Sequence, residues 1–260
     1  MTEHSYEFTR AVTRKPSASI VNGLRAADIG TPDLEQMVKD HEHYVAILRE
    51  TGAEVVELPA LEAYPDAVFV EDTALCLPEG AVMMRPGAPP RAGEVDGMSF
   101  VLRDIYNVVL DMSGPGSIEG GDILTTSREI LVGRSARTDA AGVAELQGLL
   151  DQWGYSVREV FTPEGVLHFK TDCSLLDAKT ILSTKRLDAS GCFEGYNVIH
   201  TAEGEEAAAN SIRFNQFVIM PAGFPKTAEK LCAAGYVVRE VNNTDCAKLD
   251  GGMSCLSLRF

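Results

Sequence analysis

The segment Gly52-Ala53-Glu54-Val55-Val56-Glu57-Leu58 is the first of five similar segments in the chain. The others are YNVVLD (residues 106–111), GYSVREV (154–160), GYNVIH (195–200) and GYVVREV (235–241). Each segment is rich in the β-branched residues that favour strands. They recur at intervals of about forty to fifty residues, a period that is typical of repeat architectures. The chain is therefore expected to contain five structural units.

Helical patterns precede at least three of these strands. Thr31-Pro32-Asp33 predicts a helix start, with threonine as the cap and proline at the first helical position. Apolar residues then follow helical spacing as far as Gly52. The same pattern occurs over residues 138–154 and 226–235. The common order is thus a helix, a glycine and a strand.

A loop and a β-hairpin are expected after each strand. Four hairpins are predicted at residues 73–84, 123–132, 173–182 and 211–220, where turn residues separate two apolar runs. The fifth unit has only residues 255–260, so its missing strand is predicted to be residues 8–12. That pairing would close a ring and remove most exposed strand edges. The sequence thus predicts an α/β fold, a pseudo-fivefold five-bladed α/β propeller, in one domain over residues 1–260.

The stretch from Asp250 to Phe260 carries a candidate nucleophile. Two glycines at 251 and 252 allow a sharp turn, and the alternation after them predicts Cys255, Ser257 and Arg259 on one face of a strand. A thiol is thereby presented at the mouth of a loop. A deprotonated cysteine is a good nucleophile, so an acid/base partner should lie elsewhere in the chain.

Composition and charge narrow the class of protein. The formal net charge is −15, which argues against a nucleic-acid partner and is compatible with a small cationic substrate. The six cysteines form no Cys-x-x-Cys pair, so a disulfide scaffold or zinc ribbon is not expected. No signal sequence or membrane-spanning run is recognised, which predicts a cytoplasmic protein without a membrane partner.

Polar groups occur at equivalent points of the repeat, where each loop meets its hairpin. These groups are Glu71-Asp72, Glu119-Gly120-Gly121-Asp122, His168-Phe169-Lys170-Thr171, Asn210 and Cys255. Pseudo-symmetry should gather them around the axis in one site. Carboxylates, an imidazole and a thiol suit attack on a guanidinium carbon. The carboxylates would hold the cation, the thiolate would attack, and His168 would protonate the departing amine and then activate water.

Each of these residues also has a structural explanation. His168 could be a hydrogen-bonded structural histidine, and Cys255 a small buried apolar residue, as most free cysteines are. Their coincidence at one position of the repeat favours the chemical role. Metal and nucleotide sites are not expected, because His41-Glu42-His43 lacks a second histidine four residues after the first, and Gly114-Pro115-Gly116 has the wrong spacing. No metal or other cofactor is predicted.

Several short motifs together carry a resemblance to a known family. They are Phe69-Val70-Glu71-Asp72, Arg85-Pro86-Gly87, Arg91-Ala92-Gly93-Glu94, Glu119-Gly120-Gly121-Asp122, Gly133 to Thr138, His168 to Thr171, Met220-Pro221-Ala222-Gly223 and Asp250 to Cys255. In combination they resemble the dimethylarginine dimethylaminohydrolases of the guanidine-modifying pentein superfamily. The resemblance covers nearly the whole chain and implies a five-bladed α/β propeller.

The resemblance also implies an activity and the residues that perform it. Members convert an Nω-methylated L-arginine, mono- or asymmetric dimethyl, and water into L-citrulline and methylamine or dimethylamine through a cysteine thiouronium. By similarity Cys255 is the nucleophile, His168 the acid/base and Glu119 the carboxylate that orients histidine and substrate. The implied substrate-binding residues are Asp72, Glu71, Asp66, Phe69, Arg91, Arg137, Leu24 and Leu249.

These binding residues have separate implied tasks. Asp72 would hold the guanidinium, with Asp66 and Glu71 supporting that pocket. Arg91 and Arg137 would bind the substrate α-carboxylate. The main-chain carbonyls of Leu24 and Leu249 would accept from the α-ammonium group, and residues 19–24 correspond to a mobile lid.

Other functions remain open at this point. Another guanidine-modifying enzyme, such as an arginine deiminase, an amidinotransferase or a hydroxyarginine hydrolase, would use the same covalent chemistry. A non-catalytic pentein that only binds its ligand is a further alternative. Asp172-Cys173 and Ser211 depart from the bacterial pattern next to proposed site residues. A homodimer is among the expected assemblies.

Overall fold

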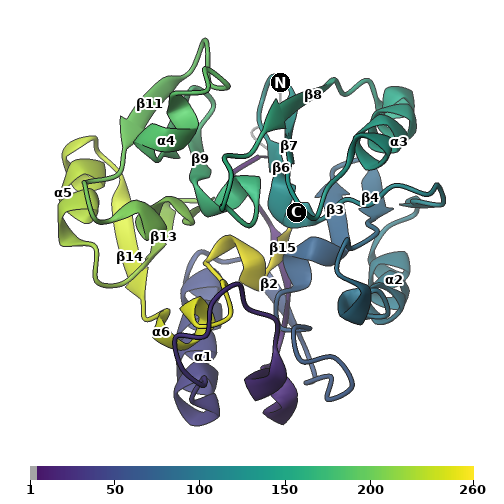
Figure 1. Cartoon of the computed structure of the whole chain (residues 1–260), viewed down its shortest axis with the longest axis horizontal. Coiled ribbons are helices and arrows are strands. Elements are labelled where there is room, and N and C mark those ends of the chain that lie inside the picture. The colour runs from purple at the N-terminus through teal and green to yellow at the C-terminus, as the bar shows by residue number, and fades with distance from the viewer. Residues whose placement is uncertain (1–4) are drawn as a thin grey trace.

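The five predicted units are five three-stranded sheets arranged around a central axis, seen in a computed structural model that describes residues 5–260 (Figure 1). The strand orders are β15-β1-β2, β3-β4-β5, β6-β7-β8, β9-β10-β11 and β12-β13-β14. The strands are β1 (Arg10–Arg14), β2 (Glu54–Leu58), β3 (Ala74–Leu77), β4 (Gly80–Met83), β5 (Val109–Asp111), β6 (Ile123–Thr125), β7 (Ile130–Arg134), β8 (Val157–Phe161), β9 (Cys173–Asp177), β10 (Thr180–Ser183), β11 (Asn197–His200), β12 (Ile212–Phe214), β13 (Phe217–Pro221), β14 (Val237–Val241) and β15 (Leu258–Arg259).

Every sheet has the same internal arrangement. Its middle strand pairs antiparallel with one neighbour and parallel with the other. In the second sheet, Met83 of β4 lies opposite Ala74 of the antiparallel strand β3, and Ala81 of β4 lies opposite Val109 of the parallel strand β5. The five similar sequence segments are the parallel strands β2, β5, β8, β11 and β14. The repeat read from the sequence and its four hairpins are therefore confirmed.

The ring closes through the strand from the amino-terminal region. β1 lies between β15 and β2. It pairs antiparallel with β15, where Ala11 lies opposite Arg259, and parallel with β2, where Arg10 lies opposite Glu54. The predicted closure is confirmed, with β1 two residues later than expected. The strand predicted over residues 255–260 is largely wrong, because Ser254–Leu256 form a 3₁₀ turn and only Leu258–Arg259 pair as a strand.

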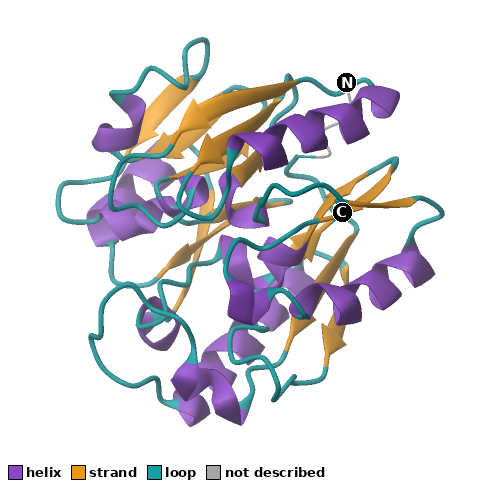
Figure 2. Ribbon diagram, turned by 45° about the vertical axis from the view of Figure 1, so that its right-hand side comes forward, coloured by secondary structure: helices purple, strands orange, loops and turns teal. Residues whose placement is uncertain are grey.

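Helices pack around the outside of the sheets (Figures 1 and 2). They are α1 (Leu34–Glu50), α2 (Glu94–Ile105), α3 (Ala140–Leu150), α4 (Lys185–Asp188), α5 (Pro225–Ala233) and α6 (Thr244–Ala247). The cap of α1 is Asp33, not Thr31, because the Asp33 carboxylate accepts hydrogen bonds from the main-chain N–H groups of Glu35 and Gln36. Gly52 follows this helix with a φ of +88°, the left-handed conformation that glycine favours.

Apolar side chains fill the space between sheets and helices. Met37, Tyr44 and Leu48 of α1 are buried against Phe214 of β12 in one cluster. Leu146 of α3 belongs to a second cluster, which also contains residues of β3, β4, β6 and β7. Each cluster therefore joins neighbouring parts of the ring. In the part of the chain described here, no helix is both long and apolar enough to cross a membrane.

The junctions between units are tightly packed near the axis, which makes Gly120 a critical position. A Cβ placed at Gly120 would lie 2.0 Å from the main-chain oxygen of Glu71. We expect Gly120→Ala to lower the free energy of unfolding by about 2 kcal/mol or more, because two backbone segments must separate. The matched control is Gly148→Ala in α3, where nothing lies within 4 Å. That change should raise stability by about 0.5–1 kcal/mol. Urea denaturation measures both, and equal stability of the two variants would contradict the expectation.

Candidate active site

A short 3₁₀ turn stands just before the innermost strand of every sheet. These turns are Val70–Thr73, Gly120–Asp122, Phe169–Thr171, Glu206–Ala209 and Ser254–Leu256. They are the repeat junctions at which the sequence predicted the chemical groups. Because the five sheets surround one axis, the turns converge and bring residues that are distant in sequence together.

A pocket at this end of the axis collects most of the predicted residues. Its lining residues are Leu24, Asp66, Phe69, Asp72, Arg91, Arg137, Leu167, His168, Leu249, Asp250, Gly251 and Cys255. Glu119 is fully buried behind His168. Glu71 faces a separate cavity along the axis, and its Oε1 accepts from Lys170 Nζ at 2.5 Å and Arg259 Nη2 at 2.6 Å. Glu71 is thus not among the residues that line the pocket, and its supporting task stays a prediction.

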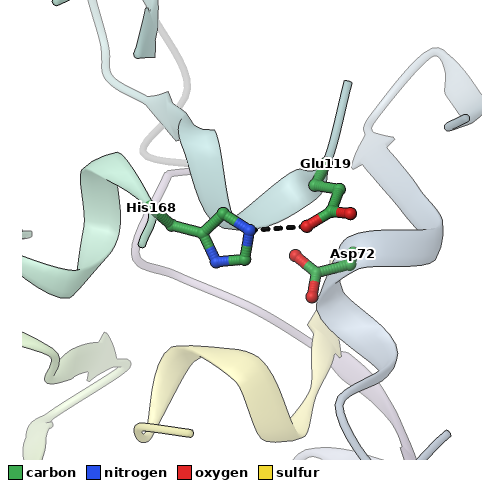
Figure 3. A group of neighbouring side chains, drawn as sticks. All are labelled: Asp72, Glu119 and His168. Carbon is green, nitrogen blue, oxygen red and sulfur yellow. Dashed lines mark hydrogen bonds and ion pairs between the residues drawn. The ribbon is translucent and has the colours of Figure 1, made fainter. Parts of the chain in front are cut away.

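His168 and Glu119 form a buried hydrogen-bonded pair (Figure 3). His168 Nε2 lies 2.6 Å from Glu119 Oε2. The other oxygen, Oε1, accepts from the main-chain N–H of Gly87 at 2.9 Å and of Ala88 at 3.2 Å, with Arg137 Nη1 at 3.4 Å. A carboxylate that accepts this many bonds is held in its ionised form. The imidazole is therefore fixed with Nε2–H donating to Glu119.

The charges around this pair set its protonation. Burial by itself would lower the pKa of His168, but Asp72, the hydrogen bond to Glu119 and the charge of Asp122 together raise the pKa to about 9. Burial would raise the pKa of Glu119, but the hydrogen bond and charge of His168, followed by Arg91 and Arg137, lower it to about 2. At neutral pH the pair is an imidazolium and a carboxylate, so His168 holds a proton that it can donate.

Asp72 is already paired with a side-chain guanidinium. Its Oδ2 accepts from Arg91 Nη1 at 2.5 Å, and its Oδ1 accepts from the main-chain N–H of Gly121 at 2.8 Å. Arg91 also contacts Glu94, with Nη2 2.8 Å from Oε2, and donates to the carbonyl of Phe69 at 2.8 Å. Asp72 can thus bind a guanidinium, and a substrate that takes this place must share Asp72 with Arg91 or displace it.

The thiol of Cys255 lies in a 3₁₀ turn at the wall of the pocket. Burial raises its pKa to about 11, with Glu71 and Asp72 adding to the effect, while the Gly252 N–H and the charge of Lys170 act in the opposite direction. Gly252 N is 3.5 Å from Sγ. The thiol is therefore protonated at neutral pH, and an added cation in the pocket would favour the thiolate.

The segment that includes the predicted lid covers one side of the pocket. Leu24 N donates to both oxygens of Asp66, at 3.0 and 3.2 Å, and Ala26 N donates to Asp250 Oδ2 at 2.6 Å. Two carboxylates thus hold this backbone, and Asp250 ties it to residues 250–255, the loop that carries the candidate nucleophile Cys255 (the nucleophile loop). Leu24 and Leu249 both line the pocket. Acceptance from a substrate ammonium group by their main-chain carbonyls stays a prediction. The mobility of residues 19–24 stays a prediction.

Asp72, Glu119 and His168 could also offer one ligand atom each to a metal ion, since these atoms lie within 4.8 Å of one another. Figure 3 shows the three side chains facing a common point. Each of the three already has a partner within the protein, because His168 and Glu119 bind one another and Asp72 contacts Arg91 and Gly121. The arrangement favours an acid/base pair beside a cation-binding carboxylate.

The sequence missed two supporting carboxylates. Glu94 binds Arg91 through both Nε and Nη2, and its only sequence signal is its place three residues after Arg91 at the start of α2. Asp122 accepts from Ser135 Oγ, Thr138 Oγ1 and Phe169 N at 2.6–2.8 Å. Asp122 belongs to the Glu119 motif, but the motif alone does not indicate this supporting task.

The departures from the bacterial pattern lie outside the pocket lining. Asp172 pairs with Arg186, whose Nη2 is 2.6 Å from Oδ1, and accepts from Thr184 Oγ1 at 2.9 Å. Cys173, at the start of β9, donates to the carbonyl of Phe169, and Ser211 donates to the carbonyl of Ala208. All three make structural contacts within their own units.

Known proteins are similar to this chain over nearly its whole length. The N(G),N(G)-dimethylarginine dimethylaminohydrolase of Pseudomonas aeruginosa is 37% identical over 254 residues, which cover 97% of this chain and 100% of that protein. The chain belongs to the dimethylarginine dimethylaminohydrolase family. The enzyme of the same name from Streptomyces coelicolor is 31% identical and covers 96% of each chain. A protein-family model for arginine deiminase matches residues 60–210.

Solved structures of this hydrolase family have the same fold. A cysteine-to-serine variant of the Pseudomonas aeruginosa enzyme, complexed with citrulline, matches with a TM-score of 0.95 at 36% identity, covering 98% of this chain and all of that one. A histidine-to-glycine variant of a dimethylarginine dimethylaminohydrolase, as an adduct with S-methyl-L-thiocitrulline, matches with a TM-score of 0.94 at 37% identity, covering 97% and 100%. This protein is thus a pentein and a hydrolase of the family.

The buried pair predicts a specific pH response. We expect the imidazole of His168 to stay protonated from pH 6 to 8 and to titrate with a pKa of about 9. Because this value exceeds the unfolded value of about 6.5, the pair adds stability that is full below pH 6.5 and is lost as pH rises through 9. Glu119→Gln should lower the pKa of His168. NMR titration of the histidine ring protons, assigned with His168→Gln, measures both values, and a wild-type pKa near 6.5 would refute the pairing.

Proposed function

We propose that this enzyme hydrolyses Nω-methylated L-arginine, mono- or asymmetric dimethyl, to L-citrulline and methylamine or dimethylamine through a thiouronium on Cys255. The observation that carries the proposal is one pocket that is lined by a thiol, a carboxylate bound to a guanidinium and a protonated histidine backed by Glu119. The chain is 37% identical to the N(G),N(G)-dimethylarginine dimethylaminohydrolase of Pseudomonas aeruginosa, and this identity supports the choice of substrate.

Substrate binding would use both ends of the amino acid. Asp72 would bind the guanidinium, and Arg137, whose side chain is 20% exposed in the pocket, would bind the α-carboxylate together with Arg91. The carbonyls of Leu24 and Leu249 would accept from the α-ammonium group. Phe69 packs against the nucleophile loop, because a Cβ at Gly251 would meet its ring at 2.4 Å, and it would form a wall beside the guanidinium.

The first half of the reaction would form the covalent intermediate. The substrate cation favours loss of the Cys255 proton to solvent, and the thiolate then attacks the guanidinium carbon, forming an S–C bond. The C–N bond to the methylated nitrogen breaks as His168 gives that nitrogen its proton. The amine leaves, and a thiouronium with a neutral His168 remains. The raised pKa of His168 suits this acid role.

The second half would release citrulline. Neutral His168 takes a proton from water, and the resulting hydroxide adds to the thiouronium carbon. The S–C bond then breaks, the Cys255 thiolate leaves, and the hydroxyl proton passes to solvent as the carbonyl of citrulline forms. His168 is again protonated, and Glu119 holds its ring through both halves.

Product analysis with a panel of substituted guanidines tests the substrate. We expect citrulline and dimethylamine or methylamine from methylated arginines, and abolition of turnover in Cys255→Ser, whose hydroxyl is far less acidic than a thiol. Cys232→Ser, at an exposed position of α5, is the matched control and should keep full activity.

The panel also separates the alternatives. The arginine deiminase model that matches residues 60–210 makes unsubstituted arginine the competing substrate. Ammonia from arginine at comparable efficiency would replace the proposal with an arginine deiminase. Preference for hydroxylated arginine would indicate a hydroxyarginine hydrolase, and transfer of the amidino group to an acceptor amine would indicate an amidinotransferase. Saturable binding without any turnover would indicate a non-catalytic pentein.

His168→Gly separates the two halves of the reaction. When the leaving group needs no protonation, we expect thiouronium formation to survive, while hydrolysis stalls for want of a base. A covalent adduct should then accumulate on Cys255, as detected by mass spectrometry of the quenched enzyme with S-methyl-L-thiocitrulline. Undiminished citrulline release and no adduct would exclude His168 as the group that activates water.

A further inference from the structure

One repeat junction has no part in the proposed chemistry. Four of the five junctions supply a side chain to it, namely Asp72, Glu119, His168 and Cys255. The fifth, after the 3₁₀ turn Glu206–Ala209, supplies Asn210, which is only 7% exposed. An asparagine at the position equivalent to catalytic groups invites the question of what its amide contacts.

The orientation of this amide is determined by its neighbours. Asn210 Oδ1 lies 3.1 Å from the main-chain nitrogen of Ser254, and the main-chain oxygen of Asn210 lies 3.3 Å from the nitrogen of Met253. A backbone N–H can only donate, so the amide oxygen must face Ser254. The amide nitrogen consequently faces the other way, where it lies 4.0 Å from Cys255 Sγ.

The nucleophile loop approaches this amide very closely. A Cβ at Gly252 would lie 2.2 Å from the Asn210 amide nitrogen, so only glycine permits the contact. Gly252 also brings its own N–H to 3.5 Å from Sγ. Within the described residues, the donors near the sulfur are this N–H, the Asn210 amide and the Ser254 hydroxyl at 4.0 Å. The Asn210 amide therefore lies ready to donate to a charged sulfur.

We propose that Asn210 is a positioning residue for the nucleophile and a hydrogen-bond donor to its thiolate. Its oxygen holds the turn that carries Cys255, and its N–H group donates to Sγ when the thiol ionises and again when the thiolate leaves the thiouronium. Catalytic hydrogen bonds are often long before substrate binds, and a bond to a charged acceptor is shorter and stronger. The inference rests on the proposed role of Cys255 as nucleophile.

Substitutions at two asparagines separate donation from loop support. Asn210→Asp keeps an oxygen for the Ser254 N–H, replaces the donor with a second oxygen and adds a negative charge near the thiol. Asn243→Asp is the matched control, because Asn243 donates to the carbonyl of Gly251 in the same loop rather than to the sulfur. The groups that otherwise influence the thiol are common to all variants. They are Glu71, Asp72, Lys170, His168, Arg259, Tyr44 and Cys246.

The measurement is the pH dependence of Cys255 alkylation by iodoacetamide, resolved by peptide mass spectrometry, together with kcat and KM for methylarginine. We expect Asn210→Asp to raise the apparent pKa of the thiol and to slow alkylation at fixed pH by about ten- to hundredfold. kcat should fall by a similar factor while KM changes little. Asn243→Asp adds the same charge beside the loop without removing the donor to the sulfur, so it should change the pKa of the thiol far less.

Two results would overturn the inference. One is an Asn210→Asp enzyme that is alkylated like the wild type, and the other is an equal effect of Asn243→Asp. A wild type that turns over no methylarginine and is not alkylated at Cys255 would overturn the proposed function as well. If Asn210→Asp does not fold, the NMR signal of the wild-type Asn210 amide decides. It should shift as the thiol titrates, and an unchanged signal would refute the contact.

Discussion

The closure of the ring by β1 is the constraint on which the rest of the molecule depends. Beyond the paired strands, the main chain of Phe260 accepts from Thr9 and Arg10 at 3.0 and 2.7 Å and donates back to Arg10 at 3.0 Å. This pairing fixes Arg259, whose guanidinium reaches Glu71 in the neighbouring unit. It also fixes the turn that carries Cys255. Without closure the five junctions would not face one another, and no single pocket would hold a thiol, an imidazole and carboxylates.

Within that ring, the buried charges neutralise one another in a protein whose net charge is −15. Arg91 lies between Asp72 and Glu94, and Glu71 lies between Lys170 and Arg259. Buried charges are tolerated only when they are paired and hydrogen-bonded. Burial raises the pKa of Glu94 to about 7 despite its contact with Arg91, so this support for Arg91 loses its charge as the pH falls through 7. The same balance keeps the thiol protonated and the imidazole charged.

Much of this arrangement could be read from the sequence. The period of the valine-rich segments predicted five units, and the position of each motif within its unit predicted which side chains would meet. What could not be read is geometry that depends on contacts between units. The turn at Cys255 replaces a strand because Asn210, from another unit, binds the backbone of Met253 and Ser254. Likewise, the pairing of Arg91 with Asp72 depends on how α2 meets the second sheet, and periodicity carries no information on that contact.

The unequal span of the strand pairings has a consequence for how the molecule folds. Four sheets are made from strands that are near one another in sequence, whereas β1 and β15 pair residues from almost opposite ends of the chain. Local pairings form quickly, while loop-closure entropy delays distant ones, by about 0.6 kcal/mol for each doubling of the loop. The ring-closing sheet, which lies next to Cys255, is therefore expected to form last. With only the four local sheets in place, the chain would already hold the His168–Glu119 pair but would leave the thiol outside it, so the site would be complete only when the ring closes.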